Sequence, residues 1–464
     1  MKSRWADDED EAAAEAQRKR EKDEKKRLKI EKQQKAAEAE QRRQKQEEAD
    51  RANEPPTDGK SIAERPAKRR RLSPSHEEDG AADQAPRKLL RFAARSWGPS
   101  RSIDNFERLN HIEEGSYGFV SRAREIATSE IVAIKKMKMD GSAQSGFPVT
   151  AIREVQTLNA AKHRHIVELR EVVVGETMDD VFLVMEFLEH DLKTLMLDME
   201  EPFVPSEIKT LMLQLGGAVE FLHQHWIMHR DLKTSNILLS NRGHLKVADF
   251  GMARFIGSTP PLNLTQLVVT LWYRAPELLL GTTIYDNSID VWSLGCIFGE
   301  LLTRDALLQG KNEVEQLSKI FELCGVPTEE SWPGFRRLPN ARSLRLPRTP
   351  QALGSIIRAR FPILTNSGTQ LLTSLLALNP ASRPSATEML AHAYFKENPR
   401  PKSTEMFPTF PSKAGQERRR RHASPNAPKR GNAPGLDGAE LDFSGIFAAR
   451  DQEEKGAGFQ LRLV

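Results

Sequence analysis

Residues 229–236, with the sequence HRDLKTSN, carry side chains that could transfer a phosphoryl group. Such a transfer requires a carboxylate that orients the incoming hydroxyl and accepts its proton, and Asp231 suits that role. It also requires oxygen ligands for Mg²⁺, which Asn236 offers from its amide carbonyl. An ordinary polar loop would not explain why an acid, a base and an amide lie together directly after a predicted helix. These residues are the strongest chemical signal in the chain.

Three charged residues elsewhere could complete a phosphate site. Asp249, in the sequence DFG at residues 249–251, offers a second carboxylate for a hard cation between phosphates. Lys135 ends the buried, strand-like sequence VAIK and would bring a positive charge to the α- and β-phosphates. Glu154 lies 19 residues further on, in a stretch that reads as a helix, and could pair with Lys135. A surface lysine or a solvated glutamate is the commoner explanation of each residue alone, so these roles depend on the motifs occurring together.

A loop with small residues precedes these motifs. Residues 114–120, EGSYGFV, would let backbone amides approach phosphate oxygens closely, although such a sequence alone is more often a plain turn. The sequence APE at residues 275–277 follows 26 residues after Asp249 and closes an activation segment. The loop, the lysine, residues 229–236, DFG and APE occur in the order that is typical of protein kinases.

In these motifs, the chain resembles the eukaryotic protein kinases over residues 106–395. The resemblance implies an α+β, two-lobed fold with a small β-rich N-lobe, a larger and mostly helical C-lobe, and ATP with Mg²⁺ between them. The catalytic residues that it implies are Asp231, Lys233, Lys135 and Asn236. Asn236 and Asp249 would hold the metal.

The same resemblance indicates which residues surround ATP. They are Ile112, Glu113, Glu114, Gly115, Ser116, Tyr117, Gly118, Phe119, Val120, Ala133, Lys135, Glu186, Leu188, Asp191 and Leu239. Met185 would stand at the back of the site, and most of the apolar members would also belong to the ordinary core. The family's loop has three glycines, and Glu113 replaces the first of them, which puts the mobility of the loop in question.

Two further contacts follow from the matching motifs. Glu277 would pair with Arg383, and Asp290 would brace the catalytic loop. Both contacts would support the catalytic residues without touching the nucleotide.

Apolar periodicity predicts the elements that must position these residues. Residues 131–134 and 181–185 read as strands. Apolar residues recur at helical spacing over 205–225, with Ser206 as the predicted N-cap. Strands dominate the early part of 105–395 and helices the later part. A segment of this length usually exceeds one core, so two lobes are expected.

The composition outside residues 105–395 predicts disorder. Residues 1–104 form a charged, low-complexity extension, whose first half pairs opposite charges at helical spacing without an apolar stripe. Residues 396–464 form a basic tail that is rich in Pro and Gly. Each extension has a basic cluster, at residues 68–71 and 418–421, which reads either as a solvated charge run or as a nuclear import signal.

Charge, cysteines and hydropathy narrow the classes of function. The net charge of +4 predicts only weak attraction to nucleic acid as a whole. The two cysteines provide neither a disulfide framework nor a metal site, and they favour a reducing compartment. No apolar run of about 18 residues predicts a membrane span, and the N-terminus does not resemble a secretory signal.

The kind of kinase can also be inferred from resemblance. Lys233 is similar to the lysine that contacts the transferred phosphate in serine/threonine kinases. Residues 148–154, PVTAIRE, look like the cyclin-binding helix of cyclin-dependent kinases, and residues 268–277, VVTLWYRAPE, are typical of the same group. Mitogen-activated kinases carry a Thr-x-Tyr pair that residues 264–267 lack. A cyclin partner is therefore implied, and Glu154 is expected to lie out of place in a nearly inactive chain until the cyclin binds.

Thr265 aligns with the activating phosphothreonine of this group. A phosphate placed there by an activating kinase would gather Arg153, Arg230 and Arg254 in charge-assisted contacts. These contacts would tie the helix that bears Glu154 to the catalytic loop and the activation segment.

Other residues align with regulatory and substrate-binding positions of the group. Ser116 and Tyr117 match its inhibitory phosphorylation sites. Val268, Val269 and Arg274 imply a preference for serine or threonine followed by proline.

Within the group, residues 146–154, GFPVTAIRE, resemble the PITSLRE branch, and residues 189–196 and 407–410 fit it as well. The neighbouring PISSLRE branch shares the glutamate variant of the loop and is the main alternative. PITSLRE kinases partner L-type cyclins and act on transcription, pre-mRNA splicing and cell-cycle progression. The resemblance implies protein substrates in the nucleus, with the cytoplasm as a second location.

Two functions of other classes are open alternatives. A pseudokinase scaffold would keep the fold without turnover, but every catalytic side chain is present. A factor that tethers RNA or spliceosomal proteins would work through the extensions. These lack aromatic residues interleaved with basic ones, so no direct sequence-specific binding of nucleic acid is expected.

Overall fold

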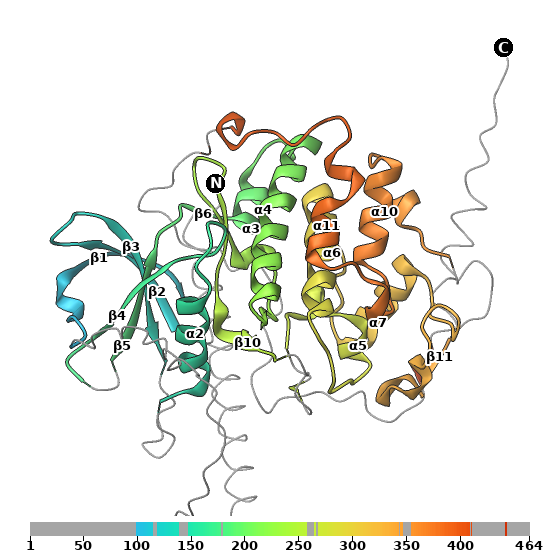
Figure 1. The fold of residues 1–464 in the computed structure, drawn as a ribbon, viewed down its shortest axis with the longest axis horizontal. Coiled ribbons are helices and arrows are strands. Elements are labelled where there is room, and N and C mark those ends of the chain that lie inside the picture. Colours follow the sequence, from blue (N-terminus) through green and yellow to red (C-terminus); the bar gives the residue numbers. More distant parts are fainter. Residues whose placement is uncertain are drawn as a thin grey trace, which may run out of the picture. The chain divides into compact units, whose positions relative to one another are not determined.

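The computed structural model describes residues 99–114, 118–138, 147–177, 180–257, 264–265, 268–342, 344–346, 354–408, 410 and 441–442. The predicted charged helix and both basic clusters lie outside the described residues. Within the described part, strands precede helices, and the elements form a β-rich N-lobe and a mostly helical C-lobe (Figure 1). The predicted two-lobed α+β fold is confirmed.

The N-lobe is built on a five-stranded antiparallel sheet with the order β1-β2-β3-β5-β4. Its strands are β1 (Phe106–Glu114), β2 (Gly118–Glu125), β3 (Ile131–Met137), β4 (Leu169–Val174) and β5 (Val181–Glu186). Alternate residues of β3, Val132 and Ile134, are buried with Val173 and Val184, as the period of two predicts. Helix α2 (Val149–Ala160) packs on the sheet through Ala151.

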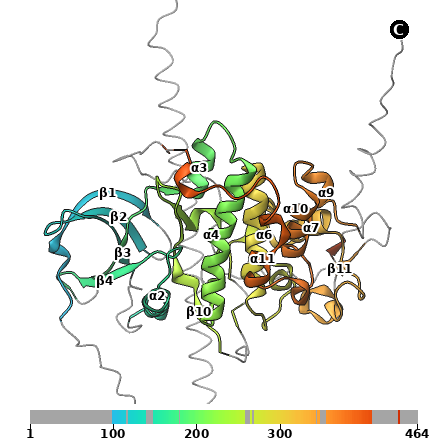
Figure 2. The same cartoon turned by 45° about the horizontal axis from the view of Figure 1, so that its top comes forward.

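The C-lobe consists of helices with short strands near the N-lobe. The helices are α3 (Leu192–Asp198), α4 (Pro205–Gln224), α5 (Pro276–Leu279), α6 (Ser288–Thr303), α7 (Glu313–Cys324), α9 (Ile357–Arg360), α10 (Asn366–Leu375) and α11 (Ala386–Ala391). Helix α4 contacts the short strands β7 and β9, and α6 and α11 pack against it (Figure 2). None of the described helices combines the length and the apolar character needed to cross a bilayer.

Short strands carry the loops on which the candidate catalytic residues lie. A three-stranded sheet has the order β6 (His190–Asp191), β8 (Ile237–Leu239) and β9 (Leu245–Val247). A two-stranded sheet joins β7 (Ile227–Met228) to β10 (Arg254–Phe255), and a parallel pair joins β11 (Leu344–Arg345) to β12 (Leu441–Asp442). Residues 229–236 therefore connect β7 to β8, and the DFG sequence connects β9 to β10.

The start of α4 differs from the prediction. Ser206 lies inside the first turn, and the N-cap is Val204. Pro205 occupies the first helical position, where its missing N–H costs no hydrogen bond and its fixed φ favours the helix. The Glu207 carboxylate accepts a hydrogen bond from the Val204 N–H at 3.1 Å. A proline and a glutamate therefore set this boundary two residues before the predicted N-cap.

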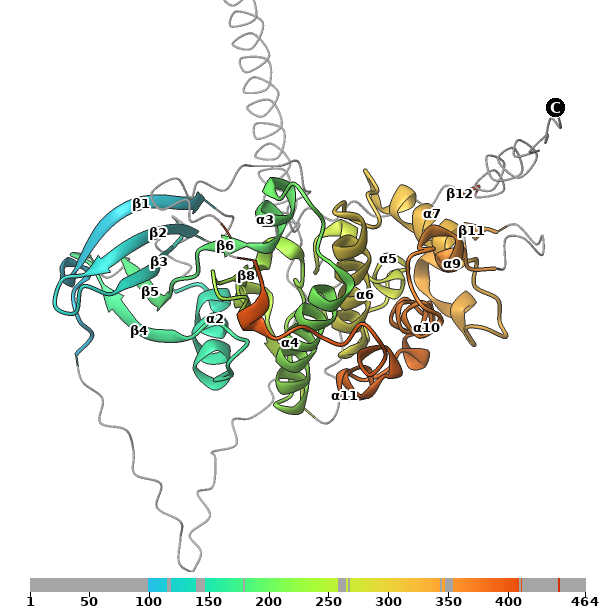
Figure 3. The same cartoon turned by 90° about the horizontal axis from the view of Figure 1, so that it is seen from above.

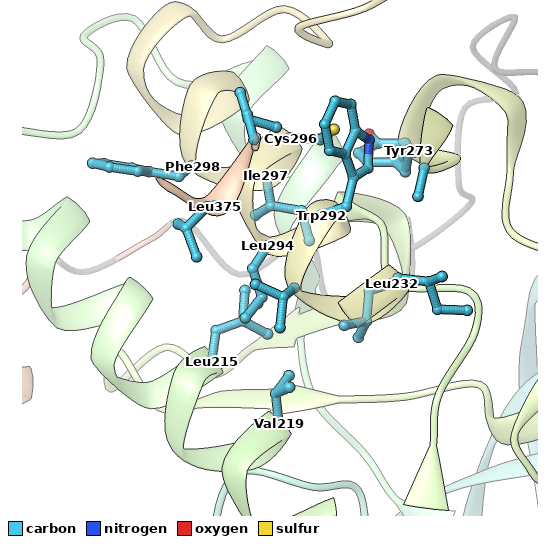
Figure 4. Close-up of a cluster of buried hydrophobic side chains, with 14 of the residues drawn as sticks. Leu215, Val219, Leu232, Tyr273, Trp292, Leu294, Cys296, Ile297, Phe298 and Leu375 are labelled. Atoms are coloured by element: carbon cyan, nitrogen blue, oxygen red, sulfur yellow. The ribbon is translucent and has the colours of Figure 1, made fainter. Parts of the chain in front are cut away.

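The core of the C-lobe anchors the catalytic loop. Leu232, between Asp231 and Lys233, is fully buried in the same apolar cluster as Leu215 and Val219 of α4 and Trp292 of α6 (Figure 4). Burial of one such leucine contributes about 1.5–3 kcal/mol, so the loop backbone is held by the core itself. The backbone of the neighbouring Asp231 and Lys233 is thereby held in place.

The ordered chain continues past the boundary predicted at Phe395. Residues 396–408 and 410, which we call the C-terminal strap, were assigned to a disordered tail from their composition. They run along α4 to β8 and β6 (Figure 3) and bury Phe407 and Phe410. The physical reason is that two aromatic side chains find apolar partners on the C-lobe, which composition alone does not indicate.

Candidate active site

The Asp231 carboxylate is held in a fixed position by its neighbours. Its Oδ1 accepts hydrogen bonds from the hydroxyl and the backbone N–H of Thr270, at 2.9 and 3.1 Å. Its Oδ2 lies 2.8 Å from the ammonium of Lys233 and 3.2 Å from the amide nitrogen of Asn236. Asp231 is 2% exposed. These contacts fix the orientation of the carboxylate.

Asp290 of α6 holds the backbone of the same loop. Its carboxylate accepts hydrogen bonds from the N–H groups of His229 and Arg230, both at 2.9 Å. Burial alone would raise the pKa of Asp290, but its hydrogen bond with His223 and the nearby His229 hold that pKa below its ordinary value. The predicted brace is present in the structure.

Lys135 connects the two lobes through two carboxylates. Its ammonium lies 2.6 Å from Glu154 Oε1 on α2 and 3.0 Å from Asp249 Oδ1 in the C-lobe. Burial acts to lower the pKa of Lys135, but Asp249 and Glu154 outweigh it and hold the pKa above its ordinary value. The same ammonium outweighs the burial of Asp249 and lowers the pKa of that carboxyl. Lys135 and Asp249 are thus both charged, as binding of phosphate and metal requires.

The position of Glu154 differs from the expectation for an isolated chain. Glu154 was expected to lie away from Lys135 until a cyclin binds, yet the two residues form an ion pair in this single chain. Both are buried, and an unpaired buried ammonium is costly, so the carboxylate of α2 is favoured beside it. Packing of Ala151 against the sheet brings α2 close enough for this contact.

Several predicted ATP-binding residues share one face of the N-lobe sheet. Ala133 precedes Lys135 by two residues in β3, so both side chains lie on the face from which Lys135 reaches Asp249. Val120 is directly opposite Lys135 on β2, and Met185 is opposite Ala133 on β5. Cross-strand partners lie on the same face. The sheet therefore brings these residues together as predicted.

In the described part of the loop between β1 and β2, the backbone leaves no room for a side chain at Gly118. A Cβ on Gly118 would lie 2.3 Å from the carbonyl oxygen of Lys136, so any side chain there would push the strands apart. Phe119 is partly exposed beside Lys138, whose ammonium lies 4.5 Å from the ring centroid. Ile112 lies in β1 and is half-buried.

Gly115, Ser116 and Tyr117 lie outside the described residues. Glu113 and Glu114 end β1, where they pair with Val120 and Phe119 of β2.

The segment after β5 carries the other predicted ATP contacts. The Glu186 carboxylate binds the Lys246 ammonium at 2.6 Å and the Glu168 N–H at 2.8 Å. Leu188 is buried, and Asp191 caps α3 by accepting the Thr194 N–H at 2.9 Å. Leu239 of β8 is buried and pairs with His190 of β6. These contacts fix the connection between the lobes.

The predicted pair of Glu277 and Arg383 is present. The guanidinium of Arg383 donates to both carboxylate oxygens of Glu277, at 2.6 and 2.7 Å, and both residues are buried. The bidentate contact ties α5, directly after the activation segment, to the segment before α11.

The surroundings of Thr265 include two of the three predicted arginines. Thr265 is exposed, and its carbonyl accepts a hydrogen bond from the Tyr285 hydroxyl at 2.7 Å. The same hydroxyl accepts a hydrogen bond from Arg230 at 3.1 Å. Burial raises the pKa of Tyr285, while Arg230 and Arg254 oppose the rise.

The third arginine, Arg153, lies on α2, whose backbone contacts β10. Arg254 lies on β10, so the two arginines come from elements that touch. The structure thus brings together the segments that the prediction joins.

Val269 has a backbone conformation that is unusual for a β-branched residue. Its φ is 65°, in the left-handed region, which is a strained position for valine. The guanidinium of Arg274 donates to the Val269 carbonyl at 3.1 Å from Nη2 and to the Val268 carbonyl at 3.1 Å from Nε. The Val269 carbonyl is therefore already bonded inside the protein.

Two residues of the site had no separate prediction. Thr270 fixes the Asp231 carboxylate, and Tyr285 links Arg230 to Thr265. Thr270 lies within a sequence that was singled out only for its group resemblance. Tyr285 lies outside every motif, so only its position in the fold reveals the contact.

Comparison with known proteins agrees with this arrangement. The family model described as "Protein kinase domain" matches residues 106–395. A fission yeast relative, serine/threonine-protein kinase ppk23 of Schizosaccharomyces pombe, is 55% identical over 313 residues, which cover 68% of this chain and 78% of the relative. The chain therefore belongs to the protein kinase family.

Two further relatives define its place within the family. Human cyclin-dependent kinase 11B is 49% identical over 71% of this chain and 41% of its own length. Cyclin-dependent kinase G-1 of Oryza sativa subsp. indica is 51% identical over 69% of this chain and 46% of its own length. The chain is an ATP-dependent serine/threonine kinase of the cyclin-dependent group, in the PITSLRE branch. It matches less than half the length of these two relatives.

Proposed function

We propose that this kinase is cyclin-dependent and proline-directed, with Asp231 as the residue that accepts the proton of the substrate hydroxyl. The observation that carries this proposal is the fixed Asp231 carboxylate, held by Thr270 and Lys233. Lys233 would meet the transferred phosphate, and Lys135 the α- and β-phosphates of ATP. Substituting Asp231→Asn should abolish phosphate transfer from ATP in the presence of a cyclin. Equal transfer by wild type and variant would contradict the proposal.

Mg²⁺ would be held by Asn236 and Asp249. The hydrogen bonds that Asn236 makes to Asp231 use its amide NH₂ group, so its amide oxygen can face a cation. The lowered pKa of Asp249 keeps its carboxylate charged, which suits a hard metal ion. When bound, the ion would neutralise charge on the phosphates, and Lys135 would orient the Asp249 carboxylate.

The nucleotide would lie against the shared face of β2, β3 and β5, described above. Ala133 and Leu239 would enclose the purine, with Ile112 and Val120 covering it. Backbone groups of Glu186 and Leu188 would meet the adenine, and Asp191 the ribose or the bound peptide.

A preference for proline follows from the geometry of Val269. Its carbonyl already accepts a hydrogen bond from Arg274, so it needs no hydrogen-bond donor from the substrate. A substrate residue with an N–H at this point would lose its hydrogen bond to water without gaining another, which costs free energy. Proline has no N–H and avoids that loss. Serine or threonine followed by proline is therefore the expected substrate.

A cyclin would bind the outer surface of α2 and β10. Val149 and Ile152 of α2 are 54% and 42% exposed, and Phe255 of β10 is 45% exposed. The two elements touch, so these side chains form an apolar surface of the kind that marks a protein interface. The expected cyclin is of the L type, and its contacts would stabilise the ion pair between Lys135 and Glu154.

Phosphorylation of Thr265 by another kinase would complete activation. Its phosphate would find Arg230 and Arg254 near Tyr285, with Arg153 coming from α2. Modification of Ser116 or Tyr117 would instead place negative charge beside the phosphates of ATP and inhibit the enzyme.

The cellular role would lie in the nucleus, in transcription, pre-mRNA splicing and cell-cycle regulation. The two basic clusters and the resemblance to the PITSLRE branch support this role. Affinity purification of the full chain from cells, followed by identification of the cyclin that co-purifies, is the decisive experiment. Recovery of an L-type cyclin is expected, and recovery of a different cyclin class would contradict this assignment.

A further inference from the structure

The C-terminal strap begins at a buried cation of α4. The Lys209 side chain is 1% exposed, and its ammonium lies 4.5 Å from the centroid of the Tyr394 ring. It donates hydrogen bonds to the carbonyls of Glu397 and Pro399, at 3.1 and 2.9 Å. A buried ammonium requires acceptors. The strap supplies two of them from its backbone.

A second set of contacts holds the strap along the first turn of α4. The backbone N–H of Lys402 donates to the Ser206 carbonyl at 3.1 Å, and the Thr210 hydroxyl donates to the Lys402 carbonyl at 2.6 Å. The Lys402 ammonium lies 2.8 Å from the Glu207 carboxylate. The strap is therefore bonded to α4 through both backbone groups and the side chain of one residue.

Phe407 packs on the turn between β8 and β9. A Cβ on Gly243 would lie 2.9 Å from Phe407 Cγ, which leaves no room for a side chain. The φ of Gly243 is +74°, a backbone conformation that also favours glycine. The Gly243 carbonyl accepts a hydrogen bond from the Gln214 amide of α4 at 3.0 Å. The ring of Phe407 thereby covers the turn that follows Leu239.

The strap ends at the segment that joins the lobes. Phe410 is 3% exposed and meets the rings of His190 and Phe203 edge to face, at centroid distances of 5.9 and 6.3 Å. His190 lies between Leu188 and Asp191, and its Nε2 lies 2.7 Å from the Asn241 side-chain oxygen. The path from α11 along α4 to β6 can be followed in Figure 3.

We propose that Phe410 is a positioning residue for nucleotide binding, which acts through His190. Strand β6 has only two residues, which pair with β8, bond Asn241 through His190 and cap α3 through Asp191. The ring of Phe410 adds a contact to His190 from the C-terminal strap. Asp191 follows His190 directly and Leu188 precedes it by two residues, so loss of the ring contact displaces the residues that meet ATP. This inference rests on the proposed ATP site. It extends the functional unit to residue 410, beyond the family match that ends at residue 395.

The test compares four variants of the full chain: Phe410→Ala, His190→Ala, the double variant and Met406→Ala. Binding of MgADP is measured by calorimetry, and KM for ATP and kcat are measured with the co-purified cyclin. Phe410→Ala should weaken MgADP binding and raise KM by about three- to tenfold, the size expected for one lost aromatic contact, while kcat stays within about twofold. Met406 lies in the strap but is 65% exposed, so its variant should bind like wild type.

The double variant separates a positioning role from a loss of stability. His190→Ala should weaken binding at least as much, because it also removes the hydrogen bond with Asn241. The double variant should be no worse than His190→Ala, because Phe410 acts through His190. Unchanged MgADP affinity in Phe410→Ala, even with a lower melting temperature, would overturn the inference. So would independent, multiplicative losses in the double variant. A wild-type chain that binds MgADP but phosphorylates no substrate would instead overturn the proposed function.

Discussion

The Asp231 carboxylate, which we propose as the proton acceptor, is held in one orientation by its neighbours. One oxygen is bound by Thr270 and the other by Lys233, so its rotation is blocked. Pre-organisation of this kind lowers the cost of reaching the reactive geometry. The residues that create it lie in two separate segments, the catalytic loop and the end of the activation segment.

The Thr270 hydroxyl should therefore matter for the rate of transfer more than for nucleotide binding. Thr270→Ala removes the hydroxyl that donates to Asp231 at 2.9 Å and accepts from the Lys233 ammonium at 3.1 Å. We expect kcat to fall by about 10- to 100-fold while KM for ATP changes little. Steady-state kinetics with a Ser-Pro peptide measure both constants. Thr270→Ser keeps the hydroxyl and should retain most activity; an equal loss in both variants would assign the effect to the methyl group.

Arg274 should control the preference for proline. In Arg274→Gln, the Val269 carbonyl loses its donors, and the ratio of kcat/KM for Ser-Pro over Ser-Ala peptides should fall by about tenfold. Glu313→Gln is the matched control, since Glu313 binds the same guanidinium at 2.6 Å but leaves the Val269 carbonyl untouched. A preserved ratio in Arg274→Gln would contradict this account.

Contacts between elements hold the catalytic loop and the activation segment in place. Asp290 of α6 bonds the backbone at His229 and Arg230, and Arg383 bonds Glu277 of α5. These links join parts of the chain that lie far apart in sequence. They explain why mutations outside the site would still change it.

The buried pair of Glu277 and Arg383 should contribute strongly to stability once formed. Arg383→Met leaves a buried carboxylate without its partner, and the free energy of unfolding should fall by about 3–5 kcal/mol. Urea unfolding of the full chain measures the change. The double variant Glu277→Leu with Arg383→Met removes both charges and should recover part of the lost stability. A double variant less stable than Arg383→Met would contradict the idea that the loss comes from an unpaired Glu277 carboxylate.

His165 connects the loop after α2 to β9 and should make stability depend on pH. Its Nδ1 lies 3.0 Å from the Leu245 carbonyl, and burial lowers its pKa from 6.5 to about 4. As the pH falls, His165 therefore takes up a proton in the unfolded chain at a higher pH than in the folded chain. The stability from this group is complete above pH 6.5 and is lost as the pH falls toward 4.

Unfolding curves between pH 4 and 7 test this prediction. The wild type should lose stability more steeply than His165→Gln, by on the order of 1–3 kcal/mol across this window. Parallel pH profiles for the two proteins would contradict the assignment to His165.

At the scale of the whole molecule, we expect activity to depend on whether Glu154 stays beside Lys135. The pair is closed in this chain, and the adjacent outer surface of α2 and β10 is apolar and exposed. A partner on that surface would shift the population toward the closed arrangement only by binding it more tightly than the open one.

A charge on this surface should separate cyclin binding from nucleotide binding. Ile152→Asp should prevent recovery of the cyclin in affinity purification, because the charge would be buried at the interface. MgADP affinity of the variant should stay unchanged. Ile363→Asp is the control, since Ile363 is 69% exposed in the C-lobe. Normal cyclin recovery with Ile152→Asp would place the interface elsewhere.

The sequence by itself determined the class of fold and most of the chemistry. Asp231, Asn236, Asp249 and Lys135 occur in short motifs whose order is specific, because phosphate transfer requires particular groups at particular places. The strands at residues 131–134 and 181–185 were also predicted correctly. Period-two burial is a local property that needs no knowledge of the rest of the chain.

Only the tertiary structure revealed several of the contacts between distant groups. The bond from Thr270 to Asp231, the link from Tyr285 to Thr265 and the docking of Phe410 on His190 join segments whose separation in sequence carries no signal. The closed pair of Lys135 and Glu154 in the single chain likewise depends on how α2 packs on the sheet. The physical reason is that residue types and local spacing reveal chemistry and periodicity, whereas contacts between distant segments arise only when the whole core is formed.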